Sequence, residues 1–119
     1  MSELAEIIAF EPDLMFSSRI ESAAEKERSK VKILTHYEDL LHQLASEAPN
    51  LLLLNLDALE GNIRRLEQFA RNENCKIIGY YSHANSQLAA EAKQIGINVF
   101  SRGSFVNRLL DLLGEFGSA

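Results

Sequence analysis

Short apolar runs and segments with helical periodicity alternate along the whole chain. Five runs have the length and composition of buried strands, at residues 5–10, 31–35, 51–56, 76–81 and 97–101. After each run, apolar residues recur every three or four positions, which predicts amphipathic helices at residues 13–27, 37–48, 59–74, 85–95 and 105–116. The pattern therefore predicts five consecutive strand–helix units.

The run at residues 51–56 is the most informative of the five. It reads Leu-Leu-Leu-Leu-Asn-Leu and does not alternate between apolar and polar positions. A strand of this kind is buried on both faces, as in the middle of a parallel sheet. Repeated strand–helix alternation predicts an α/β fold with helices on both faces of that sheet. Functional residues of such sheets lie beyond the carboxyl ends of the strands.

Residues that stop or start elements support this division. Pro12 follows the first run, Pro49 ends the second helix and Gly96 ends the fourth. Ser104 precedes the last helical segment and is predicted to cap it.

Composition narrows the class of protein. The chain has 119 residues, a net charge of −5 and one cysteine, Cys75. This length predicts one domain, with no output domain attached. A single cysteine excludes an intramolecular disulfide and a cysteine zinc site, and the acidic balance argues against nucleic-acid binding. No apolar run approaches the roughly 20 residues of a membrane span, and the first residues do not form a secretory signal. We expect a cytoplasmic protein.

Three segments resemble the receiver domain of bacterial two-component response regulators. Residues 48–56, APNLLLLNL, resemble the third strand of a receiver, in which apolar residues lead to the phosphate-accepting Asp. Residues 76–84, KIIGYYSHA, resemble the fourth strand, and residues 95–105, IGINVFSRGSF, resemble the Gly-Ala-x-x-Tyr/Phe-x-x-Lys-Pro-Phe segment. The resemblance implies a flavodoxin-like, five-stranded parallel sheet with strand order 2-1-3-4-5.

The resemblance also shows where this chain departs from a working receiver. Receivers use an Asp nucleophile, an acidic pair that holds Mg²⁺, a hydroxyl switch and a Lys that pairs with the phosphoryl group. The matching positions here are Asn55 for the nucleophile, Glu11-Pro12 for the acidic pair, Tyr81 for the switch and Gly103 for the lysine. An amide cannot form an acyl phosphate, and proline offers no metal ligand.

We therefore predict a degenerate receiver, or pseudo-receiver, with no catalytic residue, no metal and no cofactor. The residues predicted to surround its former phosphorylation pocket are Glu11, Pro12, Asp13, Asn55, Asp57, Tyr81, Ser82, His83, Arg102 and Gly103. Asn55 either caps the strand end or binds a ligand. Arg102 either pairs with an acidic neighbour such as Glu11 or Asp57, or binds an anion. His83 is a candidate contact for sensing pH or a ligand.

Two alternatives to this function stay open. Asp57 lies two positions after Asn55 and could serve as a phosphorylation site in its place. A small-ligand or nucleotide-binding sensor of the flavodoxin-like type is the second alternative, although no Gly-rich loop follows the first strand.

A domain without phosphoryl chemistry acts through its surfaces. The resemblance implies contacts through the fourth helix, fifth strand and fifth helix, here residues 85–116. The last helix has more apolar residues than one buried face needs, and we predict an interface at Phe105, Val106, Leu109, Leu110 and Leu113. Its occupant is a signalling protein or, in a homodimer, a second copy of the chain.

Overall fold

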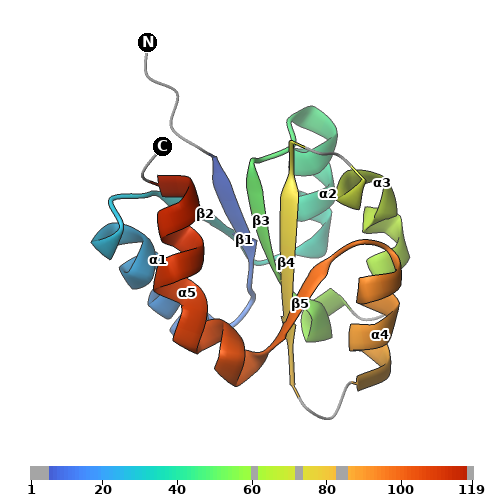
Figure 1. Ribbon diagram of the computed structural model, residues 1–119. Coiled ribbons are helices and arrows are strands. Elements are labelled where there is room, and N and C mark those ends of the chain that lie inside the picture. The colour runs from blue at the N-terminus through green and yellow to red at the C-terminus, as the bar shows by residue number, and fades with distance from the viewer. Residues whose placement is uncertain (1–5, 60–61, 72–73, 83–85, 118–119) are drawn as a thin grey trace.

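Five parallel strands form one sheet, flanked by helices, in the computed structural model of the protein (Figure 1). The structure describes residues 6–59, 62–71, 74–82 and 86–117. The strands are β1 (Ile7–Phe10), β2 (Val31–Leu34), β3 (Leu51–Asn55), β4 (Lys76–Tyr81) and β5 (Asn98–Ser101). The main helices are α1 (Leu14–Lys26), α2 (Tyr37–Ser46), α4 (Ser86–Gln94) and α5 (Arg102–Gly117). The strand order β2-β1-β3-β4-β5 confirms the predicted parallel α/β fold.

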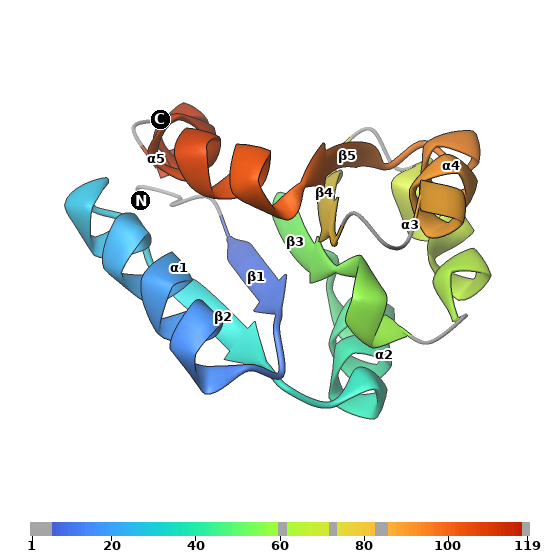
Figure 2. The same ribbon diagram turned by 90° about the horizontal axis from the view of Figure 1, so that it is seen from below.

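The helices divide between the two faces of the sheet. Figure 2 shows α1 and α5 on one side, and α2, α3 and α4 on the other. Successive side chains of a strand point to opposite faces. Leu51 and Leu53 therefore pack against α1 and α5, whereas Leu52 and Leu54 pack beneath α2 and α4. All four leucines are fully buried, as the uninterrupted apolar run of β3 predicts.

The segment after β3 differs from the long helix predicted at residues 59–74. It forms two 3₁₀ turns, η1 (Leu56–Leu59) and η2 (Ile63–Leu66), followed by one α-helical turn, α3 (Glu67–Ala70). The buried residues of each 3₁₀ turn are three positions apart. With three residues per turn, a 3₁₀ turn brings the two buried side chains to the same side of the segment.

The start of α5 also differs from the prediction. The helix begins at Arg102, and Ser104 lies inside its first turn. Ser101 takes the capping role: its Oγ accepts a hydrogen bond from the backbone N–H of Ser104 at 3.3 Å. A serine immediately before the first helical residue satisfies an N–H that has no partner within the helix.

The predicted interface on α5 is largely wrong. Phe105, Leu109 and Leu113 are buried in the core, each at most 3% exposed. The reason is that α5 packs against both the sheet and α1, so it buries a wider apolar face than a helix with one neighbour. Val106 is partly buried, and Leu110 remains 42% exposed.

Two further observations concern the core and the surface. Cys75 is buried beneath α2 and α4 and is 4% exposed. Among the described residues, no helix is long and apolar enough to cross a membrane.

Gly79 allows the chain after β3 to pack closely on β4. A Cβ atom at this position would lie 2.8 Å from Cγ and Cδ2 of Leu56, the first residue of η1. We expect Gly79→Ala to lower the free energy of unfolding by about 1–3 kcal/mol, since overpacking displaces a buried leucine. Urea denaturation measures the change. Gly103→Ala is the control because no heavy atom lies within 4 Å of its Cβ position. Equal stability of both variants would contradict the close packing at Gly79.

Candidate functional site

Three polar side chains form one row across the carboxyl ends of β1, β3 and β4. Asn55 pairs in register with Tyr80. Phe10 pairs with Leu54, so the next step along both strands brings Glu11 beside Asn55. All three side chains lie on the sheet face that α1 and α5 cover, because alternate residues of these strands pack there.

Glu11 is the centre of this row. Its side chain is completely buried. Its carboxylate accepts hydrogen bonds from Tyr80 Oη at 2.7 Å, from Asn55 Nδ2 at 2.9 and 3.1 Å, and from the backbone N–H of Asp13 at 3.0 Å. No ion pair with Glu11 occurs in the described part of the chain. The buried carboxylate is therefore stabilised by the hydrogen bonds that Tyr80, Asn55 and the backbone of Asp13 donate to it. These bonds offset the cost of removing the carboxylate from water.

The amide of Asn55 has its orientation fixed on both sides. Nδ2 donates to Glu11, while Oδ1 accepts a hydrogen bond from the backbone N–H of Ala58 at 3.3 Å. A carboxylate at this position could accept from Ala58 but could not donate to Glu11. The hydrogen bonds of Asn55 therefore link β3 to β1.

Tyr80 is a site residue that the sequence analysis missed. Burial, followed by the neighbouring charge of Glu11, raises the pKa of its hydroxyl far above the usual range. The hydroxyl therefore stays protonated and donates to Glu11. The ring stacks on Phe105 with centroids 4.2 Å apart and lies 5.2 Å from the ring of Phe16. This aromatic cluster connects β4 to α1 and α5.

Tyr81 does not belong to this pocket, contrary to the prediction. It follows Tyr80 in β4, so its side chain lies on the opposite face, packed against the core beneath α2 and α4. The alternation of side chains along a strand is the signal that separates the two tyrosines. Applied to the row that contains Asn55, it selects Tyr80.

Asp57 and Ser82 meet beside the row. Asp57 lies in η1 and is partly buried, and its Oδ2 accepts a hydrogen bond from the backbone N–H of Ser82 at 3.0 Å. The carboxylate thereby fixes the end of β4. Of the other predicted residues, Pro12 is exposed after β1, and His83 lies outside the described residues.

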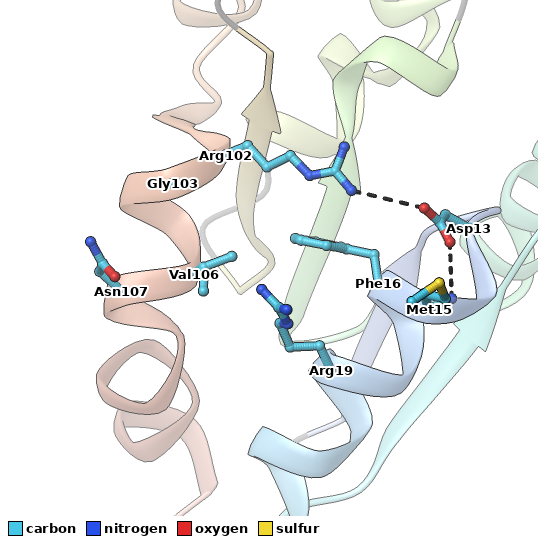
Figure 3. Close-up of a pocket in the computed structure, with 8 residues that line it drawn as sticks. All are labelled: Asp13, Met15, Phe16, Arg19, Arg102, Gly103, Val106 and Asn107. Carbon is cyan, nitrogen blue, oxygen red and sulfur yellow. Dashed lines mark hydrogen bonds and ion pairs between the residues drawn. The ribbon is translucent and has the colours of Figure 1, made fainter.

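Arg102 and Asp13 border an open groove between α1 and α5, with a volume of about 550 Å³. Figure 3 shows Arg102 reaching from α5 towards Asp13, and Arg19 reaching from α1 into the space between the helices. Nη2 of Arg102 lies 3.9 Å from Oδ2 of Asp13, and its guanidinium lies 4.3 Å from the centre of the Phe16 ring. Asp13 also caps α1 by accepting from the N–H of Met15. Arg102 thus pairs with an acidic residue, but with Asp13 rather than Glu11 or Asp57.

The positions matched to the receiver lysine and nucleophile are occupied by Gly103 and Asn55. Gly103, at the position of the receiver lysine, lines the groove without a side chain. No group of three acidic, histidine or cysteine side chains that could hold a metal ion occurs among the described residues. The side chain at the nucleophile position is an amide whose two polar atoms are both engaged.

Comparisons with solved structures identify the fold. The chain is similar to NtrX from Brucella abortus (TM-score 0.75, 15% identity), over 98% of this chain but only 27% of the NtrX chain. It is also similar to a response regulator from Thermotoga maritima (TM-score 0.74, 15% identity, 98% and 100% covered). A third match, assigned to pilus assembly (cpaE) in Burkholderia thailandensis, has a TM-score of 0.73 and 18% identity, with 98% and 100% covered. No protein-family model and no curated protein matches the sequence. The chain has the fold of response regulator receiver domains.

The two adjacent tyrosines provide a direct test of the buried row. We expect Tyr80→Phe to lower the free energy of unfolding by about 2 kcal/mol, because a hydrogen bond to a buried carboxylate is lost. Tyr81→Phe is the matched control, since no hydrogen bond of its hydroxyl to a described residue is present; we expect a change within about 0.5 kcal/mol. Chemical denaturation measures both. A larger loss for Tyr81→Phe would show that the roles are reversed.

Asn55→Asp tests whether the row tolerates a carboxylate at the nucleophile position. The substitution removes the donor to Glu11 and places two carboxylates within about 3 Å. We expect a loss on the order of 3 kcal/mol at neutral pH. Like-charge repulsion raises the folded-state pKa of the introduced carboxyl. The loss is therefore complete above that pKa and shrinks as the pH falls through it.

Asn55→Ala separates this charge effect from the loss of the hydrogen bond. It removes the same donor without adding a charge, so its destabilisation should depend much less on pH. Denaturation curves at several pH values compare the two variants. Parallel pH profiles would show that repulsion between the carboxylates is absent.

Proposed function

We propose that this chain, whose fold is that of response regulator receiver domains, is a signalling domain that acts by protein–protein contact without being phosphorylated. It carries out no catalysis of its own and needs no metal or cofactor. We place it in the bacterial cytoplasm, in keeping with its single, unpaired cysteine.

The observation that carries the proposal is the closed row at the strand ends. Asn55 occupies the position of the phosphate-accepting Asp, and its amide nitrogen donates to both carboxylate oxygens of Glu11. Glu11 in turn stands at the position of a Mg²⁺ ligand and uses both oxygens on donors of the protein. The side chains that would form the acyl phosphate and bind the metal are thus hydrogen-bonded to each other.

Asp57 is a weaker candidate for phosphorylation than its position in the sequence implies. Its Oδ2 is held by the N–H of Ser82 at the end of β4. The lysine position near it is Gly103, and Arg102 is directed to Asp13. A transferring phosphoryl group would not meet the lysine that receivers supply at that position.

Contact with another protein is supported by exposed apolar side chains. Leu14 is 74% exposed and Met15 is 84% exposed at the start of α1, beside the groove between α1 and α5. Leu110 of α5 is the third large apolar side chain that is exposed in the described part of the chain. Adjacent exposed apolar residues are typical of interaction surfaces.

A small-ligand sensor is the second candidate function. The groove between α1 and α5 favours it, because 550 Å³ lies within the usual range for ligand sites and Arg19 and Arg102 could receive an anion. The ligand would then lie between the two helices, because the strand ends are filled by the buried row.

Treatment with a small phosphodonor and Mg²⁺ tests the proposal. We expect intact-mass spectrometry to detect no added phosphoryl group, because Asn55 cannot accept one. A working response regulator receiver treated in parallel is the positive control. Thermal unfolding with nucleotides and flavins completes the test, and we expect no shift of the melting temperature.

Two outcomes would overturn the proposal. One is a gain of one phosphoryl group that is lost in Asp57→Asn, which would establish Asp57 as the acceptor. The other is a rise in melting temperature with a nucleotide or flavin that is abolished by Arg19→Ser, which would favour the ligand sensor.

A further inference from the structure

A second groove lies on the opposite face of the sheet, between α2 and the η2–α3 segment. Its volume is about 790 Å³. Two kinds of side chain line it: small or apolar residues, and a group of mostly basic polar residues. These are Leu41, Ala45, Arg64, Arg65, Glu67, Gln68, Phe69 and Arg71. None of these residues takes part in the buried row or in the groove between α1 and α5.

The groove is basic in an acidic protein. It contains three guanidinium groups and one carboxylate, whereas the whole chain has a net charge of −5. Glu67 pairs with Arg71, and Arg71 remains 75% exposed. Arg64 and Arg65 are exposed, and neither guanidinium forms an ion pair or a hydrogen bond with another described residue. Their charge is therefore available to a partner.

The local fold explains why these arginines gather at one place. Ile63 and Leu66 are fully buried and turn one side of the segment towards the core. The residues between and after them must face outwards. Arg64 and Arg65 lie between the two buried residues, Gln68 and Arg71 follow them, and all four line the groove.

The floor of the groove is apolar. Leu41 of α2 and Phe69 of α3 are partly buried and pack against the core cluster beneath them. Both still line the groove, so part of each side chain remains available for contact. The combination of an aromatic residue with arginines is typical of protein–protein interfaces.

We propose that this groove binds an acidic, amphipathic segment of a protein partner. Carboxylates of the segment pair with Arg64, Arg65 and Arg71, and its apolar residues contact Leu41 and Phe69. This inference rests on the proposed function, since it assigns a contact surface to a domain that acts through proteins. It differs from the face predicted on α5.

The observations favour a protein segment over a nucleic acid. The net negative charge of the molecule repels a long polyanion more strongly than a peptide with a few carboxylates. The apolar floor of Leu41 and Phe69 suits apolar side chains, which a sugar–phosphate backbone lacks. Guanidinium groups match carboxylates with two parallel hydrogen bonds, which suits Asp and Glu side chains placed along a helix.

Selection of a random peptide library displayed on phage tests the inference with the full chain as bait. We expect the selected peptides to combine Asp or Glu with apolar residues at helical spacing. Isothermal titration of synthetic copies then compares the natural protein with the variant Arg64→Ser/Arg65→Ser. We expect at least tenfold weaker binding by the variant.

A matched control removes the same charge elsewhere. Lys26→Ser/Lys30→Ser replaces two exposed lysines, one at the end of α1 and one before β2, and we expect affinity for the selected peptides within twofold of the natural protein. Denaturation curves check that both variants are folded. These binding experiments contain no phosphodonor. A lack of peptide binding would therefore overturn only the assignment of this groove, whereas the proposed function is tested separately by the detection of a phosphoryl group.

Four further outcomes would overturn the inference. Selected peptides without acidic residues would contradict the charge complementarity. Equal loss of affinity in both variants would indicate non-specific attraction. Tighter binding of a single-stranded oligonucleotide, lost in Arg64→Ser/Arg65→Ser, would assign the groove to nucleic acid. Concentration-dependent dimerisation lost in the same variant would show that a second copy of the chain occupies it.

Discussion

The burial of the Glu11 carboxylate is the constraint on which the functional end of this molecule depends. Removing a carboxylate from water costs several kcal/mol unless donors replace the lost hydration. Here the donors come from three places in the chain: the hydroxyl of Tyr80, the amide of Asn55 and the backbone of Asp13. No buried side-chain nitrogen or oxygen in the described residues lacks a hydrogen-bond partner. The ends of β1, β3 and β4 are consequently held in one arrangement.

The same contacts position the helices above the row. The ring of Tyr80 stacks on Phe105 of α5 and lies against Phe16 of α1. The guanidinium of Arg102, from α5, lies over the ring of Phe16. A displacement of the Glu11 carboxylate would therefore alter the packing of both α1 and α5 through Tyr80. The two grooves differ in this respect. The groove between α1 and α5 adjoins the aromatic cluster, whereas the basic groove lies on the far side of the sheet.

The sequence was sufficient for the fold because the apolar pattern is strong. Four consecutive leucines specify a strand buried on both faces, and the alternation of elements then specifies the parallel sheet. The sequence pattern misassigned the elements whose conformation or burial depends on tertiary contacts. The segment after β3 winds as 3₁₀ turns, and α5 buries Leu109 and Leu113 because α1 packs beside it. Local periodicity identifies neither the 3₁₀ winding of the first segment nor the helix that packs beside α5.

The site was predicted in part for a similar reason. Matching to a receiver selected Glu11 and Asn55 because each lies at the end of a recognisable strand, and the structure places the two side chains in contact. It selected Tyr81 over Tyr80, although only the strand register shows which tyrosine shares a face with Asn55. The partner of Arg102 depends on the position of α1 relative to α5, which no sequence spacing specifies.

The reactivity of the Cys75 thiol reports local opening of the structure around the start of β4. The thiol is buried immediately before β4, and this burial raises its pKa. Both effects suppress the thiolate that reacts with alkylating or oxidising reagents. Modification thus requires the region around the start of β4 to open, so the labelling rate at this single position follows the local opening equilibrium of the central sheet without any engineered probe.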